Sequence, residues 1–65
     1  MRAAELREMT TAELREFLEK DRQELFNLRF RASTQQLENP HRIRLVRKNI
    51  ARILTLLSQR GVQEP

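Results

Sequence analysis

Residues 42–60, RIRLVRKNIARILTLLSQR, decide the fold of this chain. An α-helix turns about 100° per residue, and at that spacing the apolar and cationic side chains of this stretch separate onto opposite sides. The apolar side is formed by Val46, Ile50, Ile53, Leu54 and Leu57. The other side is formed by Arg44, Lys48, Arg52, Thr55 and Gln59, with Arg47 at its flank. The stretch therefore predicts a helix whose apolar side packs against another helix.

The cationic side of this helix has no acidic counterpart, because Asp and Glu are absent between Asn39 and Gln63. Solvated helix faces usually mix both signs of charge, so an unmixed face indicates an anionic partner. The chain has a net charge of +4, and residues 39–65 carry six Lys or Arg against one Glu. Eleven of the 13 cations are Arg, whose planar donor fork suits phosphate. The pattern favours nucleic acid as the partner, with an acidic membrane surface as the second choice.

The composition excludes several kinds of protein and of binding site. Sixty-five residues predict one small domain, 1–65, and the lack of Cys excludes disulfides and thiolate metal sites, which fits a reducing cytosol. No segment has the roughly 18 apolar residues of a membrane span or the apolar run of a signal peptide. His41 is the only histidine, and no catalytic constellation or Gly-rich phosphate loop occurs. We therefore expect neither an enzyme nor a cofactor, metal or small-molecule substrate.

Helix signals divide the chain into three segments of an all-α fold. A short leading helix is expected over residues 3–8. Thr10 and Glu13 then match a capping box, in which each side chain accepts from the other residue's backbone N–H, and Met9 with Leu14 can form the hydrophobic staple. These signals predict a long second helix over 11–36.

The third helix is expected over 40–60. Pro40 disfavours helical geometry at Asn39 and can open the next helix with Asn39 as its N-cap. Gly61 suits the C-cap of that helix, and residues 61–65 are expected to fray. The short connection between two long helices predicts an antiparallel hairpin.

The second helix carries an apolar stripe that should pair with the third helix. The expected pairing sets Leu14, Leu18, Leu25, Leu28 and Ala32 against Ile43, Val46, Ile50, Ile53 and Leu57. Asp21 interrupts the stripe, so that layer is either open to water or supplied with a cation. A hairpin buries only one side of each helix, and we expect it to be marginal alone and to gain order from a partner.

The turn between the two long helices is rich in side-chain donors. It is either an ordinary polar loop or a clamp for an RNA backbone, since phosphates accept from Arg, Thr, Gln and free backbone N–H groups. With the cationic side of the third helix, the candidate RNA ligands are Arg29, Arg31, Thr34, Gln36, His41, Arg44, Arg47, Lys48, Arg52 and Thr55.

Several apolar side chains lie off the expected core. Phe26 and Phe30 lie about 120–160° from Leu14 around the second helix. They are either a cap over the turn, which is the expected role of Phe30, or a contact surface for a partner protein. Leu45 and Leu56 also lie away from the core of the third helix.

Three segments carry a resemblance to a known family. They are Phe26-Asn27-Leu28-Arg29-Phe30, Gln36-Leu37, and Ile50-Ala51-Arg52 followed by Thr55. Over about residues 3–60 the chain resembles the bacterial large-ribosomal-subunit protein twenty-nine family. Gln35 stands where that family usually has Gly, and Arg31 where it often has Gln.

The resemblance implies a helical hairpin with a short leading helix, in the cytoplasm as part of the ribosome. It implies a structural role in the large subunit, binding to large-subunit ribosomal RNA near the exit of the nascent-chain tunnel. It further implies the large-subunit protein twenty-three as a neighbour, and nearby docking factors for nascent chains. The alternative is a helical-hairpin adaptor that binds protein without RNA. A membrane-surface helix would need bulky aromatic residues opposite its cations, and residues 42–60 have none.

Overall fold

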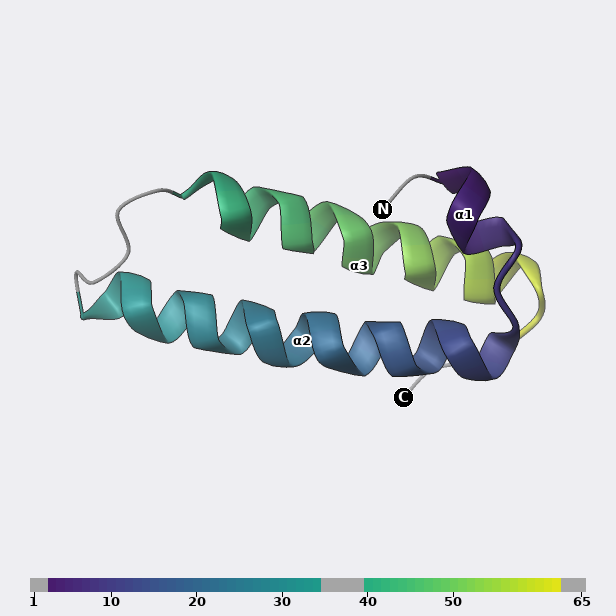
Figure 1. Cartoon of the computed structure of the whole chain (residues 1–65), viewed down its shortest axis with the longest axis horizontal. Coiled ribbons are helices and arrows are strands. Elements are labelled where there is room, and N and C mark those ends of the chain that lie inside the picture. The colour runs from purple at the N-terminus through teal and green to yellow at the C-terminus, as the bar shows by residue number, and fades with distance from the viewer. Residues whose placement is uncertain (1–2, 35–39, 63–65) are drawn as a thin grey trace.

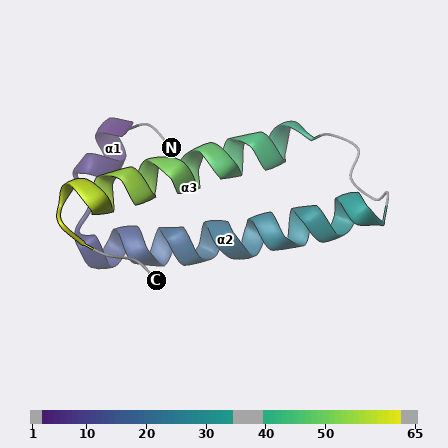
Figure 2. The same cartoon turned by 180° about the vertical axis from the view of Figure 1, so that it is seen from behind.

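The computed structural model describes residues 3–34 and 40–62. These residues form three helices and no strand: α1 (Ala3–Arg7), α2 (Thr11–Ser33) and α3 (His41–Gln59). Helices α2 and α3 lie antiparallel, side by side (Figure 1), and α1 lies beside the C-terminal part of α3. The view from behind shows the same order (Figure 2). The predicted all-α hairpin with a short leading helix is confirmed.

Helix α2 begins where its capping residues predict. The backbone N–H of Glu13 donates to the Thr10 hydroxyl at 3.1 Å, and the N–H of Thr10 donates to the Glu13 carboxylate at 3.1 Å. Two N–H groups that the first turn would otherwise leave unpaired are thus satisfied. Met9 packs against the core cluster that contains Leu14, so the predicted staple pair meets there.

The two ends that flank the connection differ from the expected boundaries. Thr34 is the C-cap of α2, and its backbone N–H donates to the carbonyls of Phe30 and Arg31, each at 3.2 Å. Pro40, expected as the first helical residue after an Asn39 cap, itself occupies the N-cap position of α3 with φ −74°. The pyrrolidine ring fixes a φ close to the helical value, so Pro40 suits the entry to the helix. Residues 35–39, which include Gln35, Gln36 and Asn39, lie outside the described part.

The C-terminus of α3 is more ordered than a frayed tail. Gly61 has φ +75° and its N–H donates to Ser58 O at 3.0 Å, while the N–H of Val62 donates to Leu57 O at 2.9 Å. These two bonds make a Schellman motif, for which Gly is favoured because it has no Cβ. Val62 also packs against the core. The expectation that fraying begins at Gly61 is therefore wrong for Gly61 and Val62.

The core lies where α1, the start of α2 and the end of α3 meet. Its five buried members are Leu6, Leu14, Leu18, Ile53 and Leu57. Leu6 is 0% exposed, so α1 supplies a central core residue. Leu28 and Val46 are also buried, farther along the hairpin.

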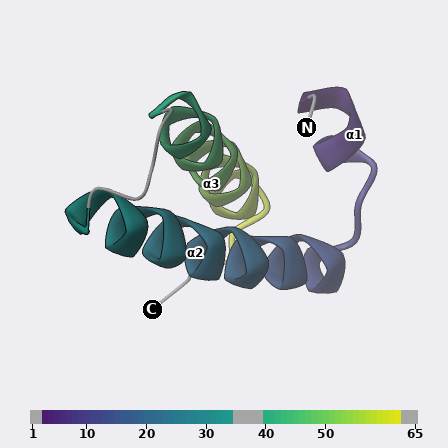
Figure 3. The same cartoon turned by 60° about the vertical axis from the view of Figure 1, so that its left-hand side comes forward.

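Toward the connection the packing thins. Leu25, Ile43 and Ile50 are only partly buried, and Ala32 is exposed, in contrast to the continuous stripe expected. Helices α2 and α3 cross at an angle and lie farther apart at the connection end (Figures 1 and 3). The small Ala32 side chain cannot bridge that wider separation.

Asp21 occupies the core stripe of α2 as a half-buried carboxyl group. Its Oδ2 atom is buried and has no hydrogen-bond partner among the described residues. Burial, together with the nearby Glu24 charge, raises the pKa of Asp21 above its usual 3.8, against an opposing effect of Arg42. Arg42 instead forms an ion pair with Glu24, with Nη2 and Nε at 2.6 and 2.7 Å from Oε1. The cation near Asp21 is therefore engaged by another carboxylate.

Candidate nucleic-acid interface

The outward side of α3 presents a cationic surface. Arg44, Arg47 and Lys48 are exposed, and with Ala51 they line a shallow concavity of about 310 Å³. Arg44 and Lys48 are one helical turn apart, about 6 Å along the axis. Charged groups at this spacing around a concave surface can approach successive phosphates of one backbone.

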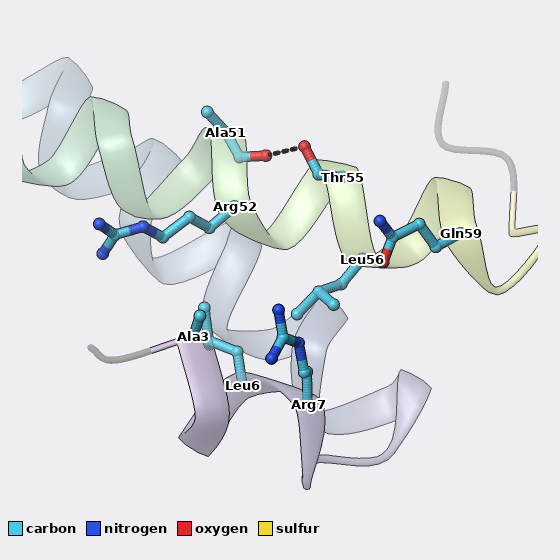
Figure 4. Close-up of a pocket in the computed structure, with 8 residues that line it drawn as sticks. All are labelled: Ala3, Leu6, Arg7, Ala51, Arg52, Thr55, Leu56 and Gln59. Atoms are coloured by element: carbon cyan, nitrogen blue, oxygen red, sulfur yellow. Dashed lines mark hydrogen bonds between the residues drawn. The ribbon is translucent and has the colours of Figure 1, made fainter.

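The remaining members of the α3 row lie next to α1. Arg52 and Thr55 line a crevice between α1 and α3 (Figure 4). The Thr55 hydroxyl donates to the backbone carbonyl of Ala51 at 2.8 Å. A phosphate oxygen is an acceptor, so Thr55 can donate to it only by giving up this bond; its oxygen remains able to accept.

At the connection end, Arg29 and Arg31 are exposed at the end of α2, and His41 is exposed at the start of α3. The Thr34 hydroxyl donates to the carbonyls of Arg31 at 3.0 Å and Phe30 at 3.3 Å, so it too is engaged by the backbone. Gln36 lies outside the described residues. The structure thus places Arg29, Arg31 and His41 at the same end of the hairpin.

A flank of α2 adds cations that the sequence analysis did not select. Arg15, Arg22 and Arg29 are exposed and lie seven residues apart, so each is only about 20° around the helix from the one before. They form one row along α2. The seven-residue spacing is visible in the sequence. It indicates a binding surface only when the neighbouring flank of α3 is known.

The ion pair between Glu24 and Arg42 identifies which flanks adjoin. Glu24 lies on the flank of α2 opposite Arg22, and Arg42 lies on the flank of α3 opposite Arg47. Because Glu24 and Arg42 meet on one side of the antiparallel pair, Arg22 and Arg47 lie on the other side. Arg47 also lines the concavity on the outward side of α3, together with Arg44 and Lys48. We name these two adjoining sides the basic face; it comprises Arg15, Arg22, Arg29, Arg44, Arg47 and Lys48.

Phe26 and Phe30 are 71% and 62% exposed. The described part of the chain covers neither ring, whereas the turn that Phe30 was expected to cap lies outside the described residues. Leu56, in contrast, is partly buried against the core, on the side where α1 packs. Leu45 is 38% exposed.

Across 3–34 and 40–62, no three His, Cys, Asp or Glu side chains gather closely enough to hold a metal ion. Within these ranges no helix combines the length and apolar character needed to cross a membrane.

Fold and charge together define a small, basic, all-α hairpin protein. Residues 4–60 match the family described as "Ribosomal L29 protein". The chain is 53% identical over 64 residues to the "Large ribosomal subunit protein uL29" of Caldicellulosiruptor bescii, covering 98% of this chain and 89% of that protein. It is 48% identical over 64 residues to the protein of the same name from Staphylococcus haemolyticus, covering 98% and 93%. The chain belongs to the ribosomal L29 protein family.

Proposed function

We propose that this chain is a structural constituent of the large ribosomal subunit and binds the ribosomal RNA through its basic face. The relatives carry the large-subunit name, and the match extends over nearly the whole chain. The observation that carries the RNA-binding part is the basic face itself, to which both long helices contribute exposed cations. All six side chains are exposed, so an external anion can reach them.

The chemistry of the basic face suits the backbone of structured RNA. Five of its six cations are Arg at exposed positions of α2 and the first half of α3. Guanidinium forks bind phosphate with two parallel hydrogen bonds. Double-stranded RNA is recognised mostly by shape and by contacts to phosphates and 2′-hydroxyls. The chain contains no Tyr or Trp, the usual stacking platforms for sequence reading. The basic face therefore positions the protein on folded RNA.

The predicted RNA ligands take different roles in this proposal. Cationic side chains supply most of the phosphate contacts: Arg29, Arg31, Arg44, Arg47, Lys48 and Arg52. The His41 ring can donate a hydrogen bond to a phosphate oxygen. Thr34 and Thr55 act through their hydroxyl oxygens, which can accept from an RNA 2′-hydroxyl while their own protons stay on backbone carbonyls. Gln36 remains a predicted ligand beyond the described residues.

The proposal is tested by titrating the full chain with a folded large-subunit ribosomal RNA fragment and with an unrelated structured RNA of equal length. We expect tighter binding to the ribosomal fragment at moderate salt, and a strong fall of affinity with rising salt because phosphate binding releases counterions. Equal affinity for both RNAs at every salt concentration would leave only non-specific attraction and contradict the proposal.

A second candidate function, protein docking, is favoured by Phe26 and Phe30. Contiguous exposed apolar side chains mark interaction sites, and two phenylalanines one turn apart on α2 form such a patch. We propose that this patch contacts a neighbouring protein, for which the family resemblance suggests the large-subunit protein twenty-three, near the tunnel exit and its docking factors. The patch lies on the outer side of α2, away from α3, and borders the basic face, since Phe26 and Arg22 line one concavity. The contact is tested by sedimenting large subunits and comparing how much parent protein and how much of a variant without the two phenylalanines is recovered in them.

A further inference from the structure

The crevice between α1 and α3 has the chemistry of a binding site. Its volume is about 240 Å³ (Figure 4). Ala3 and Leu56 supply apolar walls from the two helices, and Arg7, Arg52 and Gln59 bring polar groups to it. Among the described residues, no acidic side chain lines it.

The position of Arg7 is fixed by the chain around it. Leu6 is fully buried and anchors α1, and the Arg60 guanidinium donates to the backbone carbonyl of Arg7 at 3.0 Å. The Arg7 side chain extends from α1 toward Leu56 (Figure 4). A planar guanidinium beside an apolar wall is a surface on which an aromatic ring can stack.

Gln59 adds a hydrogen-bonding group that can read the edge of a base. Its side-chain amide has no hydrogen bond within the described part of the chain. An amide offers both donors and an acceptor, and this combination pairs with nucleobase edges, as in the two-bond contact of Gln or Asn with adenine. An apolar side chain of a partner protein could pack against the walls of the crevice. It would make no hydrogen bond with the Gln59 amide and would not stack on the Arg7 guanidinium.

The crevice is continuous with the basic face. Ala51 lines both the crevice and the concavity formed by Arg44, Arg47 and Lys48. Arg52, at the mouth, lies one turn beyond Lys48 in the same cationic row. A strand whose phosphates follow that row would thus arrive at the crevice.

We propose that the α1–α3 crevice holds one unpaired nucleobase of the bound RNA, stacked on the Arg7 guanidinium and hydrogen-bonded by Gln59. The inference rests on the proposed RNA binding and names the kind of nucleotide that binds at this end of the surface. It adds a base contact to an otherwise backbone-directed interface.

The experiment uses the ¹⁵N-labelled full chain, titrated with adenosine 5′-monophosphate and, separately, with ribose 5-phosphate at equal ionic strength. We expect the nucleotide to shift the NMR signals of the Gln59 side-chain amide and the Leu56 backbone amide, and the base-free sugar phosphate to leave them in place. Equal shifts with both compounds, or no shift at Gln59 at the highest nucleotide concentration, would overturn the inference.

Variants separate this inference from the proposed function. Gln59→Leu and Arg7→Gln should each weaken nucleotide binding about threefold to tenfold, the loss expected for one hydrogen-bonding group. Lys20→Gln is the control for the Arg7 charge change, because Lys20 lies over the Phe17 ring on α2, away from the crevice. If the parent binds the ribosomal RNA fragment but both crevice variants bind nucleotide like Lys20→Gln, only the crevice is wrong. If the parent fails to bind that RNA, the proposed function itself fails.

Discussion

The Arg60 guanidinium donates a hydrogen bond to the backbone carbonyl of Arg7 at 3.0 Å, joining residues 53 positions apart. The last turn of a short helix leaves its carbonyls without partners inside the helix. Arg60 satisfies one of them from the C-cap of α3. The bond ties α1, which has only five residues, to the end of the hairpin where the core lies.

Removing this tie should loosen α1. We expect Arg60→Gln to lower the free energy of unfolding by about 1 kcal/mol, the net value of one such bond at an exposed site. Urea denaturation followed by circular dichroism measures the change. Arg31→Gln is the matched control because Arg31 is also exposed; a loss no larger than the control's would show that the tie contributes nothing.

Leu6 and Leu25 differ in burial and should differ in their effect on stability. Leu6→Ala should cost about 2–5 kcal/mol, because Leu6 is fully buried and its removal leaves a cavity. Leu25→Ala should cost clearly less, because Leu25 is only partly buried. Thermal melts of both variants test this order. The reverse order would place the centre of the core in the middle of the hairpin.

Asp21 should make stability depend on pH. Its pKa is raised in the folded protein by burial and by Glu24, against the opposing Arg42 charge, so the folded state holds the proton more tightly than the unfolded state. Its contribution to stability is therefore fully present below the usual pKa of 3.8 and is lost as pH rises through the folded-state pKa. Asp21→Asn should remove this loss and make the protein more stable than the parent at pH 7, because the half-buried side chain then carries no charge.

The measurement for Asp21 is the difference in unfolding free energy between variant and parent, from urea titrations between pH 3 and pH 7. Glu16→Gln, an exposed carboxylate on the same helix, is the control. A stabilisation by Asp21→Asn that stays constant over the whole range would contradict the assignment, since it would not follow the titration of the carboxyl group.

The α2 flank of the basic face can be tested one charge at a time. Arg22→Gln and Arg44→Gln should each reduce the slope of log K against log salt by about 0.7–0.9, the value of one phosphate contact. Lys20→Gln, on another side of α2, should leave the slope unchanged. The assay is RNA binding at several salt concentrations. Equal slopes for Arg22→Gln and Lys20→Gln would restrict the RNA surface to α3.

The aromatic patch should matter for assembly rather than folding. Phe26→Ala with Phe30→Ala should leave helicity and melting temperature nearly unchanged, because both rings are more than 60% exposed. Incorporation into sedimented large subunits should fall. Phe17→Ala is the contrasting variant, since Phe17 packs against the core and its loss should lower stability. Normal incorporation of the double variant would contradict the proposal that Phe26 and Phe30 contact a neighbouring protein.

Features set by neighbouring residues were predictable from the sequence. The Thr10–Glu13 box and the Gly61 cap are short-range hydrogen-bonding patterns, and both are present. Leu28 and Ile53 were expected in the core and are buried, and Leu25 and Ile50 are only partly covered. Ala32 is exposed near the connection, where the helices lie farther apart. That separation depends on how whole helices cross, which periodicity along one helix does not specify.

The packing of α1 against the hairpin also could not be predicted from periodicity. Five residues carry one apolar anchor and no repeat, so neither the burial of Leu6 nor the partial cover of Leu56 follows from their spacing. The same holds for Arg22, whose role depends on which flank of α3 lies beside it. The engaged hydroxyls of Thr34 and Thr55 are different, because Thr in a helix commonly donates to the preceding turn, and that rule was available in advance.

The uneven core also implies a gradient of local stability along the hairpin. Backbone amides near Leu14, Leu18 and Ile53 sit beneath the apolar cluster, where opening requires most of the structure to come apart. Leu28 and Val46 are buried but lie outside that cluster. We therefore expect amide hydrogen exchange near them to proceed through smaller openings. One end of the molecule then acts as a rigid anchor, while the Arg29 and His41 end can adjust its fit to the surface it meets without unfolding the rest.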